Sequence, residues 1–296
     1  MNIQIDREGS EINQILRLLK MDRKKILSVI TMVVIVIPLL LFLPLNFLSI
    51  AISIIVSLSI WEFFKLRFSS EISLGLSLLL FFFLISFSLG IGLQLSISVI
   101  GLITWMILGI LILGFPHNKN ILQNIFFWFF SGFFIHVSFF SSFFLLASYP
   151  NPLSESTGIE LSSRGTLILL ITISALMDSL AYFGGLKFGK RKFLPNVSPN
   201  KTLEGFLIAV LSTPLIVMPI LALFYKYNFF KVLILIFLVS IFSVLGDATA
   251  SLFKRISGVK DSSNIIPGHG GFFDRLDSHL AAAPCFVLLI YFMRGF

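Results

Sequence analysis

Long uncharged apolar stretches constrain this chain more than any other feature. Residues 26–43 carry no charged side chain over 18 positions, and residues 72–115 carry none over 44. About 20 apolar residues cross a bilayer as a helix, so these runs are too long for the core of a soluble domain. Backbone groups in hydrocarbon must be paired within their own segment, and the runs are continuous rather than alternating, which favours helices over a barrel. The sequence therefore predicts an all-α polytopic membrane protein.

Nine membrane spans can be drawn along the chain. They cover residues 26–43, 45–62, 72–90, 94–115, 121–147, 165–186, 203–224, 229–251 and 277–293. Residues 1–25 precede the first span and place apolar residues on one helical face with charges opposite. This pattern predicts a cytoplasmic amphipathic segment that lies on the membrane surface.

The basic residues determine the expected orientation. With a cytoplasmic amino terminus, 18 of the 22 Lys and Arg residues lie in the cytoplasmic tail and turns, and four lie outside: Arg164, Lys226, Lys231 and Arg294. Positive residues collect on the cytoplasmic side of membrane proteins, so this orientation is preferred over its inverse. The net charge of +8 then lies mostly where anionic lipids or phosphates are attracted. No nucleic-acid partner is expected, since the basic residues lie in short turns between spans.

Acidic residues are concentrated at one end of the last four predicted spans. After Glu160 only six remain, all at or near the predicted cytoplasmic ends of these spans: Asp178, Glu204, Asp247, Asp261, Asp274 and Asp277. A carboxylate in lipid costs about 2.5 to 3.5 kcal/mol, which suggests a function unless it pairs with a nearby Lys or Arg as a structural contact. We therefore expect residues 26–164 to form a transmembrane scaffold and residues 165–296 to form a catalytic transmembrane domain.

Three of these carboxylates predict a metal site. Asp247 lies near the end of the eighth predicted span, and Asp274 and Asp277 lie three residues apart at the start of the ninth. Oxygen ligands from two helices suit Mg²⁺ and leave positions open for substrate phosphates. His269 is the single His in this segment, so zinc is not expected. The intervening glycines let the backbone turn tightly and approach closely: Gly268, Gly270 and Gly271.

Two segments predict phosphate binding on the same side of the membrane. In "LPNVSPNKTLEGF", Ser198 followed by Pro199 predicts a helix N-cap, with free backbone N–H groups beside Lys201. The second segment surrounds the glycines with cations that can neutralise a polyphosphate: Lys254, Arg255, Lys260 and Arg275. Together with the carboxylates, these segments predict metal-assisted phosphoryl or nucleotidyl transfer at the cytoplasmic surface.

Three motifs carry a family resemblance: "DSLAYFGGLKFGKRK" (178–192), "SPNKTLEG" (198–205) and "SLFKRISGVKDSSNIIPGHGGFFDRLDS" (251–278). Together they resemble the CDP-diacylglycerol synthase family, also called phosphatidate cytidylyltransferases. The sequence differs from the family pattern at Leu186 and Lys187, where Arg commonly follows glycine, and at Leu203, where Trp is common. The amino-terminal half is similar in hydropathy and span number, and also in Glu62 after Trp61.

The resemblance implies transfer of a cytidylyl group from CTP to phosphatidic acid, giving CDP-diacylglycerol and pyrophosphate. It implies Mg²⁺ held by Asp247 and Asp274 with Asp277, and leaves a second, monovalent cation open. The implied catalytic residues are Asp247, Asp274, Lys254 and Arg275. The implied substrate-binding residues are Ser198, Lys201, Arg255, Lys260, His269, Gly270 and Gly271. Asp178, Glu204 and Asp261 are second candidates for metal support or base recognition.

The expected partners are CTP, phosphatidic acid and membrane lipids, and a homodimer is left open. The expected location is a bacterial inner (plasma) membrane, with the active site facing the cytoplasm. One alternative is a CTP-dependent polyprenol or isoprenoid-alcohol kinase, or a synthase that uses an ether lipid. A transporter is the alternative from another class, but its charged site should lie near mid-membrane between inverted repeats, and the sequence has no evident internal repeat.

Overall fold

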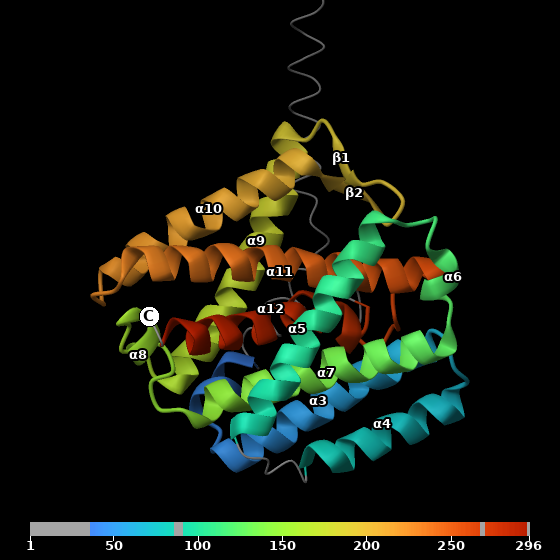
Figure 1. The fold of residues 1–296 in the computed structure, drawn as a ribbon, viewed down its shortest axis with the longest axis horizontal. Coiled ribbons are helices and arrows are strands. Elements are labelled where there is room, and N and C mark those ends of the chain that lie inside the picture. Colours follow the sequence, from blue (N-terminus) through green and yellow to red (C-terminus); the bar gives the residue numbers. More distant parts are fainter. Residues whose placement is uncertain (1–35, 86–90, 267–269, 295–296) are drawn as a thin grey trace, which may run out of the picture.

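The computed structural model describes residues 36–85, 91–266 and 270–294, and almost all of its regular structure is helical. Its long helices, labelled as in Figure 1, are α3 (Leu45–Lys65), α4 (Ser70–Ile85), α5 (Ile91–Leu113), α7 (Ile125–Ser148), α9 (Ser163–Phe188), α10 (Leu203–Ala222), α11 (Phe229–Ile256) and α12 (Phe272–Met293). Two single turns, α6 (Lys119–Leu122) and α8 (Ser154–Thr157), lie between them. Strands β1 (Lys192–Leu194) and β2 (Ser198–Thr202) form a short antiparallel hairpin. The predicted all-α fold is confirmed.

Seven of the described helices are long and apolar enough to cross a membrane: α3, α5, α7, α9, α10, α11 and α12. Helix α4 covers much of the predicted third span but has only 16 residues. Most of the predicted first span and the whole amphipathic segment 1–25 lie outside the described residues. An integral membrane protein is therefore supported, and the number of nine spans stays a prediction.

The turns that carry most of the basic residues meet at one end of the bundle. The side chain of Asn196 donates to the carbonyl of Phe115, which links the β-hairpin to the segment after α5. Arg255, in the last turn of α11, donates to the carbonyl of Val197 in the same hairpin. We call this end of the bundle, formed by residues 65–69, 114–124, 189–202, 254–266 and 270–272, the basic end.

The four basic residues predicted to lie on the other side of the membrane share the opposite end. Arg164 donates to the carbonyl of Leu43, and Lys231 donates to the carbonyl of Met293. The end of α12 lies beside α8 at this end (Figure 1). The two groups of turns are thus separated as the charge pattern predicts, while the membrane side that each faces stays a prediction.

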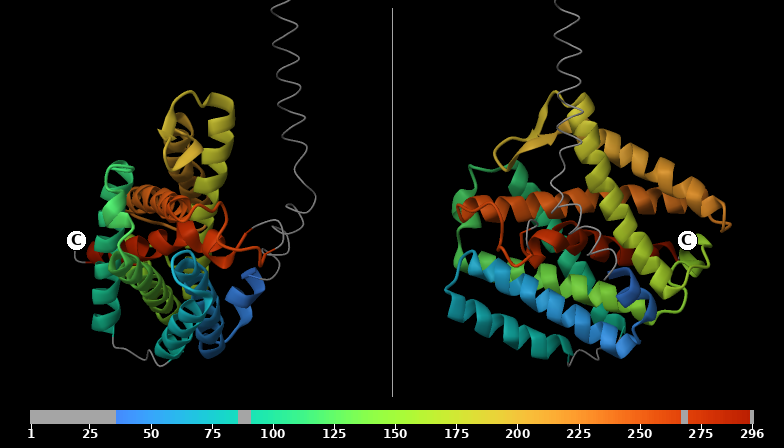
Figure 2. Two further views of the ribbon diagram at one scale, coloured as in Figure 1. Left: turned by 90° about the vertical axis from the view of Figure 1, so that its right-hand side faces the viewer. Right: turned by 180° about the vertical axis from the view of Figure 1, so that it is seen from behind.

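The antiparallel pair α11 and α12 forms the centre of the bundle. Helix α5 crosses the pair on one side (Figure 1), and α9 crosses it on the other (Figure 2). A single cluster of buried apolar side chains extends from Leu40 to Ile290 and includes residues on both sides of position 164. The predicted division into a scaffold and a catalytic domain is not tested by this packing, which is continuous across the proposed boundary.

A buried aromatic cluster lies directly beneath the basic end. The ring of Phe63 on α3 lies 4.9 Å from that of Phe253 on α11, 5.3 Å from that of Phe273 on α12 and 5.3 Å from that of Trp128 on α7. All four side chains are almost completely buried, so the four helices are fixed together at this level. Each Phe of the cluster is adjacent in sequence to a charged residue: Glu62, Lys254 or Asp274.

Candidate active site

The β-hairpin leads into the first turn of α10, and here one prediction is wrong. Ser198 and Pro199 belong to β2, and the helix is capped by Thr202, whose side chain accepts a hydrogen bond of 3.2 Å from the amide of Gly205. Proline is tolerated in an edge strand, and threonine is a good N-cap, so the helix begins four residues later than predicted. Lys201 nevertheless lies directly before the helix start.

Glu204, a second candidate for the site, fastens the turn between α9 and the hairpin. Its carboxylate accepts hydrogen bonds from the backbone amides of Lys190, at 2.9 Å, and Arg191, at 3.0 Å. These contacts support the structural alternative for this residue.

Lys201 forms an ion pair with Asp247 of α11. The two side chains are 28% and 26% exposed, so solvent or a ligand can reach both of them. A partly exposed ammonium group can exchange a carboxylate partner for a phosphate oxygen, since both are anionic acceptors.

This ion pair faces a cavity of about 520 Å³ between α9, the hairpin, α10 and α11. The volume is within the range of small-molecule sites. The polar side chains that line it are Asp178, Lys192, Ser198, Asn200, Lys201, Thr202 and Asp247. The apolar and aromatic ones are Ala181, Tyr182, Leu186, Phe193, Phe206 and Val244. A charged group and an apolar group of one ligand can therefore be bound in the same cavity.

Three carboxylates come together where α9, α11 and α12 meet. Asp178 and Asp277 each interact electrostatically with Asp247 and with one another. Ser278 donates through its hydroxyl to Asp178, at 2.9 Å, and through its amide to Asp277, at 2.8 Å. A Cβ on Gly246 would lie 2.2 Å from the carbonyl oxygen of Asp277, so the missing side chain allows α11 and α12 to approach closely.

A divalent cation at the acidic cluster stays a prediction. In the part of the chain that the structure describes, no group of three or more His, Cys, Asp or Glu side chains is placed to hold a metal ion. Mg²⁺ usually takes one or two carboxylates and completes its shell with water and substrate phosphates. Asp178, Asp247 and Asp277 supply carboxyl oxygens, and the nearby cations are Lys201, Lys254 and Arg275.

Asp274 lies deeper, in the first turn of α12. Its Oδ1 accepts from Lys254 Nζ at 2.5 Å, and its Oδ2 accepts from the amides of Ser262, at 2.8 Å, and Gly271, at 3.0 Å. The side chain is only 5% exposed. A metal bound by Asp274 would compete with Lys254 for the same oxygens, so the predicted pairing of Asp274 with Asp247 around a metal stays a prediction.

The glycines before α12 make room for carboxylates. Gly270 has a φ of 77°, in the left-handed region, and a Cβ there would lie 2.5 Å from Asp274 Oδ2. A Cβ on Gly271 would lie 2.2 Å from Glu62 Oε2. The expected close approach is thus present at both positions, and the tight turn at Gly270. Gly268 and His269 lie outside the described residues.

The other predicted substrate contacts lie on the surface of the basic end. Arg255 donates at 3.4 Å to the carbonyls of Val197 and Val259. Lys260, Asp261 and Arg275 are exposed side chains. Their substrate contacts stay predictions.

Sequence reasoning missed the part that Glu62 has in this region. Glu62 is completely buried at the end of α3. Its Oε2 accepts from the amide of Phe273, at 2.8 Å, and the hydroxyl of Ser262, at 2.9 Å, while its Oε1 accepts from the hydroxyl of Ser263, at 2.7 Å. The available signal was the single carboxylate within the first five predicted spans, which is costly there unless it is paired.

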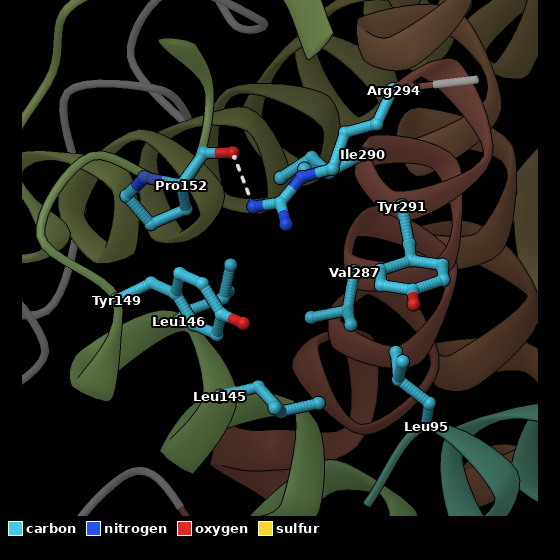
Figure 3. A pocket seen from close by; sticks show the side chains of 9 residues that line it. All are labelled: Leu95, Leu145, Leu146, Tyr149, Pro152, Val287, Ile290, Tyr291 and Arg294. Carbon is cyan, nitrogen blue, oxygen red and sulfur yellow. Dashed lines mark hydrogen bonds between the residues drawn. The ribbon is translucent and has the colours of Figure 1, made fainter. Parts of the chain in front are cut away.

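A second, much smaller cavity lies at the opposite end of the bundle (Figure 3). It measures about 30 Å³ and is bordered mainly by apolar side chains of α7 and α12. Arg294 reaches over it toward the carbonyl of Pro152 and forms an ion pair with Glu155. The volume suits about one water molecule, so this cavity is too small for a nucleotide or a lipid head group.

Comparison with known proteins agrees with the motifs. The model of the cytidylyltransferase family matches residues 23–293. The phosphatidate cytidylyltransferase of Haemophilus influenzae is 46% identical over 136 residues, which are 43% of this chain and 47% of the relative. That of Bacillus subtilis is 47% identical over 118 residues, 38% of this chain and 42% of the relative. That of Pseudomonas aeruginosa is 40% identical over 131 residues, 44% and 48% of the two chains. The matches span about half the length of these relatives.

Proposed function

Because the chain belongs to the cytidylyltransferase family, we propose that it transfers the cytidylyl group of CTP to phosphatidic acid, with CDP-diacylglycerol and pyrophosphate as products. The observation that carries the proposal is the cavity that holds the Lys201–Asp247 ion pair beside apolar side chains of α9 and α10. The substrate pair combines phosphate groups with a base and a lipid, and this cavity offers both kinds of surface.

The reaction needs no protein nucleophile. A phosphate oxygen of phosphatidic acid forms a bond to the α-phosphorus of CTP, while the bond from that phosphorus to the bridging oxygen of the β-phosphate breaks. Pyrophosphate leaves with the bonding electron pair. The protein therefore has to position two anionic substrates and reduce the repulsion between them.

Lys201 is placed to bind a phosphate. It extends from β2 into the cavity, directly before α10. If a phosphate oxygen replaced Asp247 as its ion-pair partner, the positive charge of Lys201 would stay balanced. Lys192 lines the same cavity and adds a second cation, while Ser198 and Asn200 add neutral polar groups. The apolar lining then excludes water from one side of the reacting groups.

The acidic cluster is the proposed place for Mg²⁺. Asp247 and Asp277 would hold the ion, with Asp178 as a further oxygen donor and Asp274 as an alternative ligand if it is released by Lys254. When bound, the ion neutralises phosphate charge and helps to orient the reacting groups. A second, monovalent cation bound by the carboxyl oxygens of the same cluster is part of the proposal.

We propose that the basic end faces the cytoplasm of a bacterial inner (plasma) membrane. The 18-to-4 distribution of basic residues supports this side, and the named relatives are bacterial. CTP and phosphatidic acid are then the partners on that side. A homodimer remains a proposal without a supporting contact.

The test is product analysis with purified protein in detergent, CTP labelled in the α-phosphate, Mg²⁺ and phosphatidic acid. We expect labelled CDP-diacylglycerol and one equivalent of pyrophosphate. Release of CDP together with a phosphorylated lipid alcohol would instead identify a CTP-dependent kinase. If neither product forms from phosphatidic acid, from an ether-linked analogue or from a polyprenol, the proposed transfer is wrong.

A further inference from the structure

Glu62 connects the amino-terminal half of the chain to the start of α12. It accepts from the amide of Phe273, which lies 211 residues later in the chain. The first amides of a helix lack partners within the helix, and the positive end of the helix favours a carboxylate. Asp274 accepts from the amide of Gly271 within the same turn. The start of α12 is therefore capped by one carboxylate of its own and by one from α3.

Ser262 joins these two carboxylates. Its hydroxyl oxygen lies 2.9 Å from Glu62 Oε2 and 2.9 Å from Asp274 Oδ2, and its amide also donates to Asp274. The hydroxyl of Ser262 has one proton, so it can donate to only one of the two carboxylates at a time. Glu62, Ser262 and Asp274 therefore form one hydrogen-bonded network in which two carboxylates share a donor. Ser263 binds the other oxygen of Glu62. Glu62 thus holds the segment that follows α11, residues 257–266, at two consecutive positions. We call this segment the loop.

The network continues to the other side of α12. Asp274 pairs with Lys254, which lies on α11 seven residues after Asp247. Seven residues are about two helical turns, or about 10 Å along the axis, on nearly the same face. The same loop carries Lys260 and Asp261, which are exposed at the basic end. A displacement of Glu62 would therefore be transmitted to the loop, to the first turn of α12 and, through Asp274, to Lys254 on α11.

We infer that Glu62 is a positioning residue: it holds residues 257–266 and the first turn of α12 in the arrangement that the transfer reaction requires. The inference rests on the proposed function. Glu62 acts through Ser262, Ser263 and Phe273, while the cavity is lined by residues of α9, the hairpin, α10 and α11. The amino-terminal half of the chain then contributes directly to the geometry of the catalytic end.

The test compares three variants with wild type for kcat and KM per folded protein, with thermal unfolding measured in parallel. Glu62→Met keeps the volume but removes both acceptors, and kcat should fall by about a hundredfold, as for a small misplacement of reacting groups. Glu62→Gln keeps one acceptor oxygen and should restore much of kcat. Ser263→Ala removes one hydrogen bond and should lower kcat by about threefold to tenfold. KM for CTP should change less than kcat in all three.

The matched control is Ser141→Ala, because Ser141 is also buried and also donates between helices, to the carbonyl of Gln94. We expect its kcat to equal that of wild type. Unchanged kcat per folded protein in Glu62→Met would overturn the inference, even if the total activity falls with the amount of folded protein. If Glu62→Met does not fold, unchanged kcat in both Ser263→Ala and Glu62→Gln overturns it instead.

A second measurement separates this inference from the proposed function. Val259→Cys in a Cys285→Ala background places a thiol on the loop at a position that is 38% exposed. Its rate of reaction with a water-soluble maleimide should rise when Glu62→Met is added and stay unchanged with Ser141→Ala. An equal rate in all backgrounds would show that Glu62 does not hold the loop, whatever reaction the wild-type protein catalyses.

Discussion

Lys254 and Asp274 form an ion pair with 2.5 Å between Nζ and Oδ1, although they belong to different helices. The side chains are 11% and 5% exposed. Removing one partner of a buried pair leaves an unbalanced charge and costs about 3 to 5 kcal/mol. We therefore expect Lys254→Met to lower the unfolding temperature strongly, and the double change Lys254→Met with Asp274→Asn to recover much of the loss. Thermal unfolding of wild type and of these two variants in detergent measures this.

The exposed pair of Arg294 with Glu155 is the control for this prediction, because the carboxylate is 72% exposed. Glu155→Gln should leave the unfolding temperature almost unchanged. Equal stability of wild type and Lys254→Met would contradict the structural importance of the pair.

Asp247→Asn should abolish most turnover without unfolding the protein. The change keeps the shape of the side chain but removes an anionic oxygen beside Lys201, Asp178 and Asp277. Losing charge neutralisation in the transition state should cost on the order of a thousandfold in rate. The side chain is 26% exposed, so the neutral amide remains solvated and stability should change little.

CTP-dependent turnover across a Mg²⁺ titration, beside thermal unfolding, measures the effect of Asp247→Asn. Glu160→Gln is the control, since Glu160 is an exposed carboxylate at the opposite end of the bundle. A variant that keeps more than about a tenth of the wild-type rate at every Mg²⁺ concentration would speak against a metal ligand, because a lost ligand costs several kcal/mol.

Lys201→Met should weaken the binding of CTP or of phosphatidic acid. A hydrogen bond to a charged group contributes about 1.5 to 3 kcal/mol, so the Michaelis constant for the affected substrate should rise by about tenfold to a hundredfold. Stability should stay near wild type, because both partners of the ion pair are partly exposed. Lys190→Met is the control: Lys190 is exposed, and its backbone rather than its side chain binds Glu204. Unchanged Michaelis constants for both substrates with full turnover would contradict the assignment.

The sequence predicts the helical class and the two ends of the bundle well, because hydropathy and charge act locally and additively along each span. The same reasoning places Asp274 at the start of α12, where the structure has it, whereas α11 continues to Ile256, beyond the predicted end of its span at residue 251. Long spans need about 20 apolar residues regardless of their neighbours. These properties therefore do not depend on knowing the tertiary contacts.

Contacts between distant segments could not be predicted in this way. The pattern of Ser198 and Pro199 satisfies the rules for a helix start, but pairing of Ser198 with Leu194 places them in a strand. Local propensities are routinely overridden by such contacts. Glu62 has its partners about 200 residues later, and no spacing rule connects them.

Gly246→Ala should disturb the approach of α11 to α12. A Cβ at this position would lie 2.2 Å from the carbonyl oxygen of Asp277, and backbone on the facing helix cannot yield as a flexible side chain can. The helices would have to separate beside Asp247, and overpacking of this kind costs about 1 to 3 kcal/mol. We expect a lower unfolding temperature and a large loss of turnover.

Gly75→Ala is the matched control for Gly246→Ala. Gly75 also lies within a helix, α4, but its Cβ would meet nothing within 4 Å. Alanine favours a helix over glycine by about 1 kcal/mol, so stability should stay equal or rise. Similar losses in both variants would indicate that any added methyl group harms these helices, and the close approach at Gly246 would then have no special importance.

The orientation of the bundle can be tested with single cysteines in a Cys285→Ala background. Lys190 lies at the basic end and Lys226 at the opposite end, and both side chains are exposed. If the basic end is cytoplasmic, as the positive-inside rule requires, a membrane-impermeant maleimide added to intact cells should label Lys226→Cys alone. Lys190→Cys should react only after the membrane is permeabilised, and the denatured proteins should label equally. Labelling of Lys190→Cys in intact cells would invert the orientation and place the cavity with Lys201 and Asp247 on the side away from cellular CTP.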